Sequence, residues 1–181
     1  TAIIGGAKVS SKIDVITHLL DKIDNLIIGG GMAFTFFKAQ GGSIGSSLVE
    51  DEYLETAKKI LSLAKEKGVN VMLPEDSVIA DAFSNDAHIK VVSSMEIEAG
   101  WMGLDVGSKA IETYRDVISK SKTILWNGPL GVFEMENFSL GTKSLGEMIA
   151  QSSAYSLVGG GDSVAAVKKF NLSDEVSYVS T

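Results

Sequence analysis

The sequence contains no cysteine, two histidines and two prolines in 181 residues. Without cysteine the chain can form neither a disulfide framework nor a thiolate metal site, and this composition fits a reducing compartment. His18 and His88 are isolated, with no partner at metal-ligand spacing and no nucleophile–histidine arrangement of the kind used in covalent catalysis. We therefore expect a cytoplasmic protein whose chemistry does not depend on histidine or cysteine.

Long apolar runs and an excess of basic residues are also missing. A membrane helix needs about 18 consecutive apolar residues, and the best candidate, residues 26–37, is interrupted by three glycines. No export signal is visible at the start. The 16 Lys and Arg residues against 23 Asp and Glu give a net charge of −7, whereas a nucleic-acid surface calls for a basic stripe. We expect neither a membrane span nor a nucleic-acid partner.

The residues that are present indicate one α/β domain. Hydrophobic residues make up 45% of the chain, and 181 residues lie within the usual domain range of roughly 50–250. Short β-rich runs alternate with segments of helical period, which is typical of a mostly parallel sheet covered by helices. Helices are expected near residues 11–22, 54–67, 111–118, 140–150 and 162–169, and strands near residues 3–4, 26–28, 69–73, 123–126, 155–158 and up to 179.

Residues 75–106 break this alternation. They contain most of the turn residues and the segment Gly100-Trp101-Met102-Gly103-Leu104-Asp105. Long irregular segments in compact domains are usually functional. Between a functional excursion and a pair of short strands with a weak pattern, we favour the excursion.

Four of the expected strands end in glycine before a helix or turn, at residues 5–6, 29–31, 128 and 159–161. In open α/β sheets the ligand crevice lies outside the carboxyl ends of the strands. Glycine lets backbone N–H groups approach a ligand, and a helix that follows directs its free N–H groups to the same place. A single cluster is explained equally well by a tight turn, but four clusters favour an anion-binding rim.

Common phosphate motifs are absent from this rim. There is no G-x-x-x-x-G-K-[ST], and Phe34 and Val164 stand where a G-x-G-x-x-G fingerprint requires its last glycine. Lys8 and Lys12 instead follow the first glycine turn four positions apart, a spacing that disfavours a helix by about 0.2–0.5 kcal/mol. An anion between them would reverse this effect. The alternative is a pair of solvated lysines with Asp14 nearby.

Three polar positions complete the candidate site. Asp162 follows the last glycine cluster and suits either an N-cap role or Mg²⁺, which prefers one or two carboxylates together with substrate phosphates. Asn127 and Glu134 flank the turn at residues 127–134. Each could bind a ligand or stabilise its own turn.

Five segments of the chain closely resemble the C-terminal domain of the phosphoglycerate kinases. They are residues 5–12 (GGAKVSSK), 27–36 (IIGGGMAFTF), 100–105 (GWMGLD), 126–134 (WNGPLGVFE) and 159–163 (GGGDS), in this order. The resemblance spans nearly the whole chain. It implies a Rossmann-like three-layer α/β/α domain that binds MgATP or MgADP within a monomeric, two-domain glycolytic enzyme, which moves a phosphoryl group between 1,3-bisphosphoglycerate and ADP.

The resemblance also implies a role for each matching position. Lys8 and Lys12 would contact the phosphates, and Lys12 would stabilise the group in transfer. Asp162 would hold Mg²⁺, Ser163 and Asn127 would contact phosphate, and Glu134 would bind the ribose hydroxyls. The glycine-rich turns would supply Gly5, Gly6, Ala7, Gly160 and Gly161, and the adenine pocket would be walled by Gly29, Gly30, Leu48, Phe83, Gly103, Leu104 and Val132. Such roles suit phosphoryl transfer, where catalysis is mostly positioning and charge neutralisation.

The chain departs from the family pattern in two ways. Ser163 stands where the family usually has Thr, a change that keeps the hydroxyl. The family also has an N-terminal substrate domain and a further glycine-rich helix start after the position of Thr181, and neither is present here. We therefore expect the chain to be inactive alone. The alternative from another class is a non-catalytic, nucleotide-responsive interaction module.

Overall fold

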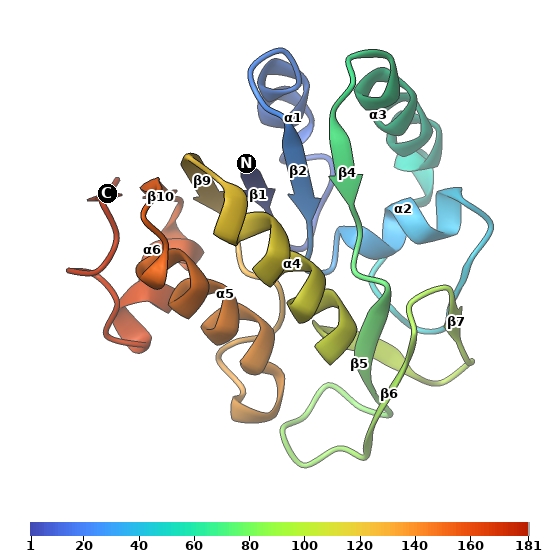
Figure 1. Cartoon of the computed structure of the whole chain (residues 1–181). Helices are drawn as coiled ribbons and strands as arrows, with labels where there is room; N and C mark the ends of the chain where they lie inside the picture. Colours follow the sequence, from blue (N-terminus) through green and yellow to red (C-terminus); the bar gives the residue numbers. More distant parts are fainter. Residues whose placement is uncertain (181) are drawn as a thin grey trace.

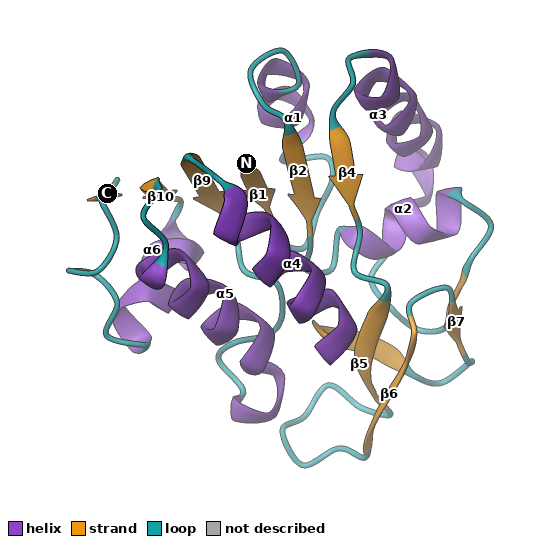
Figure 2. Cartoon of the chain, viewed as in Figure 1, coloured by secondary structure: helices purple, strands orange, loops and turns teal. Residues whose placement is uncertain are grey.

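A computed structural model describes residues 1–180 of the chain. Helices and strands alternate along most of its length (Figures 1 and 2). In chain order they are β1 (Ala2–Ile4), α1 (Ile13–Leu19), β2 (Asn25–Ile28), α2 (Ala33–Ala39), β3 (Ser43–Ile44), the 3-10 helix η1 (Asp51–Tyr53), α3 (Leu54–Glu66), β4 (Asn70–Met72), β5 (Asp76–Ala80), β6 (Ile89–Ser93), β7 (Glu96–Ile97), β8 (Met102–Val106), α4 (Ser108–Lys120), β9 (Thr123–Asn127), the 3-10 helix η2 (Glu136–Phe138), α5 (Leu140–Gln151), β10 (Tyr155–Gly159), α6 (Gly161–Lys169) and β11 (Tyr178–Val179).

The central sheet has six strands in the order β11-β10-β9-β1-β2-β4, and every neighbouring pair is parallel. From β1 the chain first adds strands on one side (β2, β4) and then on the other (β9, β10, β11). The order therefore reverses between β1 and β9, as in doubly wound folds. Ligands in such folds bind outside the carboxyl ends of the strands at this reversal.

Helices cover both faces of this sheet. Successive side chains of a strand point to opposite faces, and β1 shows the result: Ile3 packs in a core with residues of α4, α5 and α6, while Ile4 packs in a second core with residues of α1, α2 and α3. Figure 1 shows α4 and α5 lying next to each other across one face. The expected three-layer α/β/α arrangement with a mostly parallel sheet is confirmed.

Residues 75–106 form strands as well as an excursion. β5 pairs antiparallel with β6 and β8, and β7 pairs with β3, so the region contains four strands where the sequence suggested at most two. The exposed β6 lacks the alternation of a half-buried strand, and Gly103 interrupts the apolar run of β8. These features weaken the alternation of apolar and polar residues by which a strand is recognised in a sequence. The region lies at the lower edge of Figure 1, beyond the end of β4.

Two helices differ from their expected form. α1 covers Ile13–Leu19 and is shorter than the expected residues 11–22, because residues 9–12 form a turn in which the Lys12 N–H donates to the Val9 carbonyl at 2.8 Å. α2 was not predicted. Its residues from Ala33 to Phe37 are all buried and Lys38 is its one exposed residue, so it has no continuous polar face and no amphipathic period.

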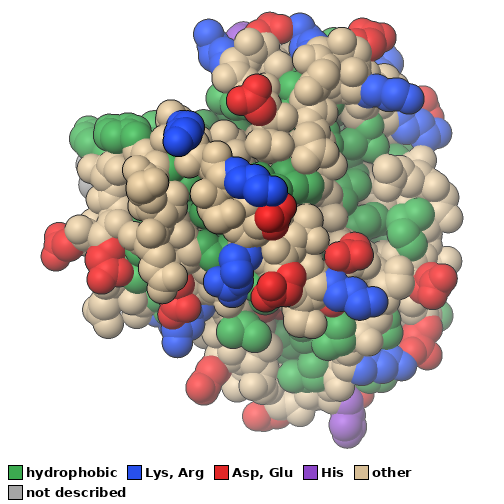
Figure 3. All heavy atoms as spheres, viewed as in Figure 1, with side chains coloured by type: hydrophobic (Ala, Val, Ile, Leu, Met, Phe, Trp, Pro, Cys, Tyr) green, Lys and Arg blue, Asp and Glu red, His purple; other side chains and the backbone are tan. Residues whose placement is uncertain are grey.

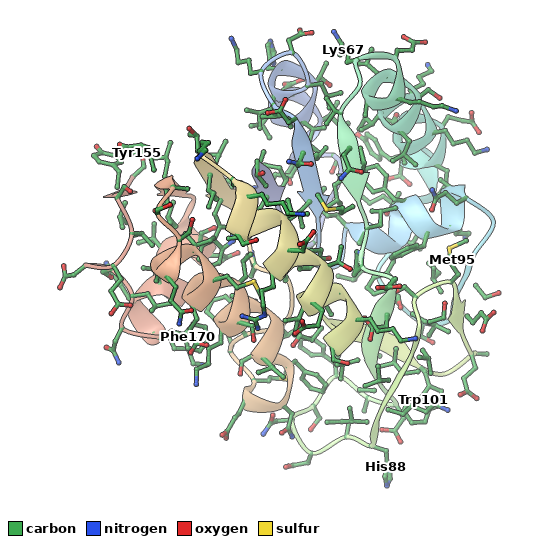
Figure 4. All side chains as sticks on the ribbon, in the orientation of Figure 1. Lys67, His88, Met95, Trp101, Tyr155 and Phe170 are labelled. Carbon is green, nitrogen blue, oxygen red and sulfur yellow. The ribbon has the colours of Figure 1, made fainter. Side chains whose placement is uncertain are left out.

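Surface charges are largely arranged as local pairs. On the face drawn in Figure 3, basic and acidic side chains alternate over α4, where Lys120 pairs with Asp116 at 3.2 Å. Lys67, at the end of α3 (Figure 4), pairs with Asp21 after α1 and so ties these two helices together. None of the described helices is long and apolar enough to cross a membrane.

Candidate functional site

The turns after β1 and β9 are joined at the reversal of the sheet. The Gly5 N–H donates to the Asn127 carbonyl at 2.8 Å, and the Gly6 N–H donates to the Pro129 carbonyl at 3.2 Å. A Cβ atom added to Gly5 would lie 2.1 Å from the Pro129 oxygen, so only glycine fits there. Glycine is thus needed at this position for close approach of two backbones, which builds the floor of the site.

A cleft of about 290 Å³ opens above these turns. It brings together the candidate phosphate and metal residues from three separate parts of the chain, and we call it the lysine cleft. Its walls are Gly5, Gly6, Ala7, Lys8, Ser11, Lys12, Asn127, Gly128, Pro129, Gly160, Gly161, Asp162 and Ser163.

Lys12 is the cation of the lysine cleft whose ammonium group is hydrogen-bonded. Its Nζ donates to Oδ1 of Asn127 at 2.5 Å, and Nδ2 of Asn127 donates to the Gly159 carbonyl at 3.1 Å. Lys12 is half-buried, whereas Lys8 is exposed at the edge. Neither lysine forms an ion pair within residues 1–180. Their charge is therefore available to an anion.

Asp162 lies in the first turn of α6, where its side chain is exposed and takes part in no hydrogen bond or ion pair among the described residues. The N-cap of α6 is Gly160, whose φ of 92° is a left-handed conformation that favours glycine. The alternative explanation of Asp162 as an N-cap is therefore wrong. A carboxylate that lines the same cleft as two lysines suits Mg²⁺ held jointly with phosphates.

Ser163 is placed differently from its neighbours. Its side chain is fully buried, and its Oγ accepts a hydrogen bond from the Gly128 N–H at 2.5 Å. The hydroxyl therefore supports the turn after β9 from within the wall of the cleft. Contact between Ser163 and a phosphate stays a prediction; because Oγ only accepts the Gly128 hydrogen bond, the hydroxyl proton is left to donate.

A second, mostly apolar cavity of about 770 Å³ adjoins the lysine cleft. Gly6, Ala7, Pro129 and Asp162 line both. We call it the base cavity. Of the seven residues assigned to the adenine pocket, six line it, namely Gly30, Leu48, Phe83, Gly103, Leu104 and Val132.

Gly29, the seventh, is buried outside the base cavity. A Cβ atom at this position would lie 2.4 Å from Cδ2 of Leu130. Gly29 therefore makes room for Leu130, which lines the base cavity together with Gly30 and Gly31. Glu134 lies exposed among the lining residues of the base cavity, where a ligand hydroxyl can reach its carboxylate.

Several residues that line the base cavity were not predicted from the sequence. Pro74, Ser77, Met102 and Met135 also border the base cavity. Asp105, which the sequence offered only as part of a motif, is a buried carboxyl in its wall, 4% exposed. Its two oxygens accept hydrogen bonds from the Val106 N–H at 2.8 Å and from the Gly141 N–H at 3.0 Å.

The environment of Asp105 changes its acidity. Burial raises the pKa of this carboxyl to about 7, although the hydrogen bonds from Gly141 and Val106 favour the ionised form. Added Cβ atoms on Gly131 and Gly141 would each come within 2.4 Å of its Oδ1. Asp105 therefore fills the space between the turn after β9 and the start of α5, and it fixes one wall of the base cavity.

Comparison with known families agrees with this geometry. The family model described as phosphoglycerate kinase matches residues 1–181, the whole chain. The chain belongs to the phosphoglycerate kinase family. A phosphoglycerate kinase from Porphyromonas gingivalis is 59% identical over 184 residues, which cover 100% of this chain and 44% of the relative.

Solved phosphoglycerate kinases have the same fold. The structure from Coxiella burnetii matches with a TM-score of 0.97 at 50% identity, and the structure from Pyrococcus horikoshii OT3 with a TM-score of 0.83 at 26% identity. Each comparison covers 99% of this chain and 46% of the solved one. The chain thus spans less than half the length of these phosphoglycerate kinases.

Proposed function

We propose that this chain is the nucleotide-binding, C-terminal domain of a phosphoglycerate kinase and that it binds MgADP and MgATP. The observation that carries the proposal is the junction of the apolar base cavity with the lysine cleft at the strand-order reversal of the sheet. A nucleotide has the same division into an apolar base and a charged phosphate chain. The two cavities share Gly6 and Ala7, so one ligand can occupy both.

The residues of each cavity suit the part of the nucleotide assigned to them. Adenine would lie between Leu48, Phe83 and Leu104, and Glu134 would accept hydrogen bonds from the ribose hydroxyls. The phosphates would meet Lys8, Lys12 and the free N–H groups at the start of α6, where the helix dipole favours negative charge.

Asp162 fits a magnesium ion because it is exposed, unpaired and adjacent to the proposed phosphate position. When bound, Mg²⁺ would neutralise part of the phosphate charge. The protein would hold it through this single carboxylate, with phosphate oxygens and water as the remaining ligands. Within residues 1–180 there is no group of three or more His, Asp or Glu side chains that could hold a metal without substrate.

The reaction we propose is reversible phosphoryl transfer between 1,3-bisphosphoglycerate and ADP, which yields 3-phosphoglycerate and ATP in glycolysis in the cytoplasm. Lys12 would place its ammonium group beside the moving phosphoryl group, with Asn127 fixing its direction, and Lys8 would add positive charge. Such groups act by positioning and by stabilising developing charge. The phosphoglycerate would be bound by a second domain, so this chain alone is inactive, and the complete enzyme acts as a monomer.

Calorimetric titration tests the nucleotide site. MgADP should bind the chain saturably, and binding should be lost in the double variant Lys8→Ala, Asp162→Ala. The matched control is Lys59→Ala, Asp174→Ala, which removes an exposed lysine and an exposed aspartate outside both cavities. No saturable heat from the folded chain, or equal binding by both double variants, would refute the site.

Activity measurements test the proposal that the chain alone does not catalyse the reaction. The chain mixed with 1,3-bisphosphoglycerate and MgADP should form no detectable ATP, because the second substrate has no site on it. Sustained ATP formation by the purified chain would contradict this part of the proposal while leaving nucleotide binding intact.

A further inference from the structure

The segment that carries the two lysines has few hydrogen bonds of its own. Residues 9–12 form a turn rather than a helix, and Lys12, the N-cap of α1, makes no side-chain capping hydrogen bond. Lys8 and Lys12 also repel each other. The buried side chain of Val9 anchors the segment in the core, and a polar group beside it holds its backbone.

Glu50 is that group. Its Oε1 accepts a hydrogen bond from the Ser10 N–H at 3.1 Å, although the two residues lie 40 positions apart. Burial by itself would raise the pKa of Glu50, but hydrogen bonds from Ser10 and Val9, together with the charge of Lys8, lower it below its ordinary value. The carboxylate is therefore ionised at neutral pH, and charge-assisted hydrogen bonds of this kind are the stronger ones.

Glu50 is itself firmly placed. Its backbone N–H donates to Oγ1 of Thr35 at 3.1 Å, and Thr35 is a buried residue of α2. The carboxylate is thus anchored to the helix that follows the second glycine cluster. No part of Glu50 lines the lysine cleft or the base cavity, so it acts on them through other residues.

The segment of Glu50 also reaches the base cavity. Leu48, two residues earlier, lines that cavity. A Cβ atom on Gly31 would lie 2.8 Å from Cδ1 of Leu48 and 3.4 Å from Cα of Ala7, so Leu48 and the lysine segment flank the same glycine. Residues 48–50 therefore border the base cavity at one end and hold the lysine segment at the other.

We propose that Glu50 is a positioning residue for phosphate binding: its carboxylate fixes the backbone of Ser10 and thereby directs Lys8 and Lys12 into the lysine cleft. The inference rests on the proposed nucleotide site. It predicts that loss of Glu50 affects the phosphate half of the nucleotide and not the base half. The backbone that Glu50 holds carries the phosphate contacts, whereas other residues form the base cavity.

The test compares MgADP with adenosine, which has no phosphates. In the folded chain, Glu50→Ala should weaken MgADP binding about tenfold, which corresponds to about 1.4 kcal/mol. Glu50→Gln keeps one acceptor oxygen and should weaken it by a smaller factor, about threefold. Adenosine affinity, measured by NMR titration, should stay within about twofold of the unsubstituted chain. The control is Glu52→Ala, which removes an exposed carboxylate two residues away.

Hydrogen exchange supplies a second measurement that does not require a ligand. The Ser10 amide should exchange faster in Glu50→Gln than in the unsubstituted chain, while the amides of α3 keep their rates. If Glu50→Ala does not fold, Glu50→Gln decides the question by both measurements.

Three results would overturn the inference. MgADP affinity of the Glu50 variants equal to that of Glu52→Ala would show that the carboxylate does not position the lysines. Equal losses for MgADP and adenosine would show a merely structural role. Absence of MgADP binding by the unsubstituted chain would overturn the proposed function as well, whereas the first two results leave it standing.

Discussion

Lys12 and Asn127 lie 115 positions apart in the sequence, and Nζ of Lys12 donates to Oδ1 of Asn127 at 2.5 Å. The amide group of Asn127 in turn donates to the Gly159 carbonyl at 3.1 Å. This short chain of hydrogen bonds links the start of α1 to the carboxyl ends of β9 and β10. Because the Asn127 amide is neutral, it orients the lysine ammonium group without cancelling the positive charge that a ligand would meet.

Replacement of Asn127 by Ala should therefore weaken MgADP binding because Lys12 loses its orientation. We expect a loss of about 1.5 kcal/mol, at the lower end of the range for one hydrogen bond to a charged group. In a double-mutant cycle, the loss in Asn127→Ala with Lys12→Met should be smaller than the sum of the single losses by about 1 kcal/mol. Calorimetry measures all four proteins, and Asn137→Ala, outside both cavities, is the control. Additive losses would show that the two side chains act independently.

Substitution of two apolar residues of the base cavity should weaken adenosine binding without lowering the stability of the fold. Phe83 and Leu48 are 61% and 60% exposed in the free chain, so truncating either to Ala removes little buried area and should change the free energy of unfolding by at most about 0.5 kcal/mol. Each should nevertheless weaken adenosine binding, since the base would cover these side chains. Leu140→Ala is the matched control, because Leu140 is also 61% exposed and lines neither cavity. Equal adenosine affinities in all three variants would contradict the assignment of the cavity.

Gly131 should tolerate no side chain. In Gly131→Ala the new methyl group would lie 2.4 Å from Oδ1 of Asp105, and we expect a loss of about 1–3 kcal/mol in the free energy of unfolding, as for overpacked cores. Gly161→Ala is the control, since its Cβ would meet no atom within 4 Å and its φ is not left-handed. Urea denaturation followed by circular dichroism measures both. Similar midpoints for the two variants would show that Asp105 can move aside.

Asp105 should make the stability of the chain depend on pH. Its pKa is raised from 3.8 to about 7 in the folded chain by burial, so between these values the folded state binds more protons than the unfolded state. Linkage then requires that the contribution of Asp105 to the free energy of unfolding be complete below about pH 4 and be lost as pH rises through about 7. Within this window the slope approaches about −1.4 kcal/mol per pH unit.

The comparison with Asp105→Asn isolates this effect from other carboxyl groups. Denaturation curves at pH 5, 6, 7 and 8 should show that the difference in unfolding free energy between the unsubstituted chain and the variant shrinks as pH rises. A difference that is constant with pH would mean that the pKa of Asp105 is close to its ordinary value.

The sequence was sufficient to predict those parts of the fold and site that depend on local pattern. The four glycine clusters predicted one rim because carboxyl ends of parallel strands meet at one edge, and Lys12, Asn127 and Asp162 do line one cleft. α2 was missed because its first five residues are all buried, which leaves no continuous polar face to reveal a helical period.

Residues whose partners are distant in the sequence could not be found in this way. Asp105 accepts a hydrogen bond from Gly141, 36 positions later, and Glu50 accepts one from Ser10, 40 positions earlier. Nothing in the local spacing around either carboxylate indicates these contacts. The burial of Ser163 beneath the turn after β9 likewise depends on Gly128, 35 positions away.

The most direct test of the central claim is an NMR titration of the ¹⁵N-labelled chain with MgADP, which reports where the ligand binds. We predict one saturable event in which amide signals of Gly6, Lys12 and Gly161 shift together with those of Phe83 and Leu104, because the lysine cleft and the base cavity hold one nucleotide. Shifts confined to the separate groove lined by Phe37, Leu61 and Met95 (Figure 4), or no saturable shifts at all, would contradict the account.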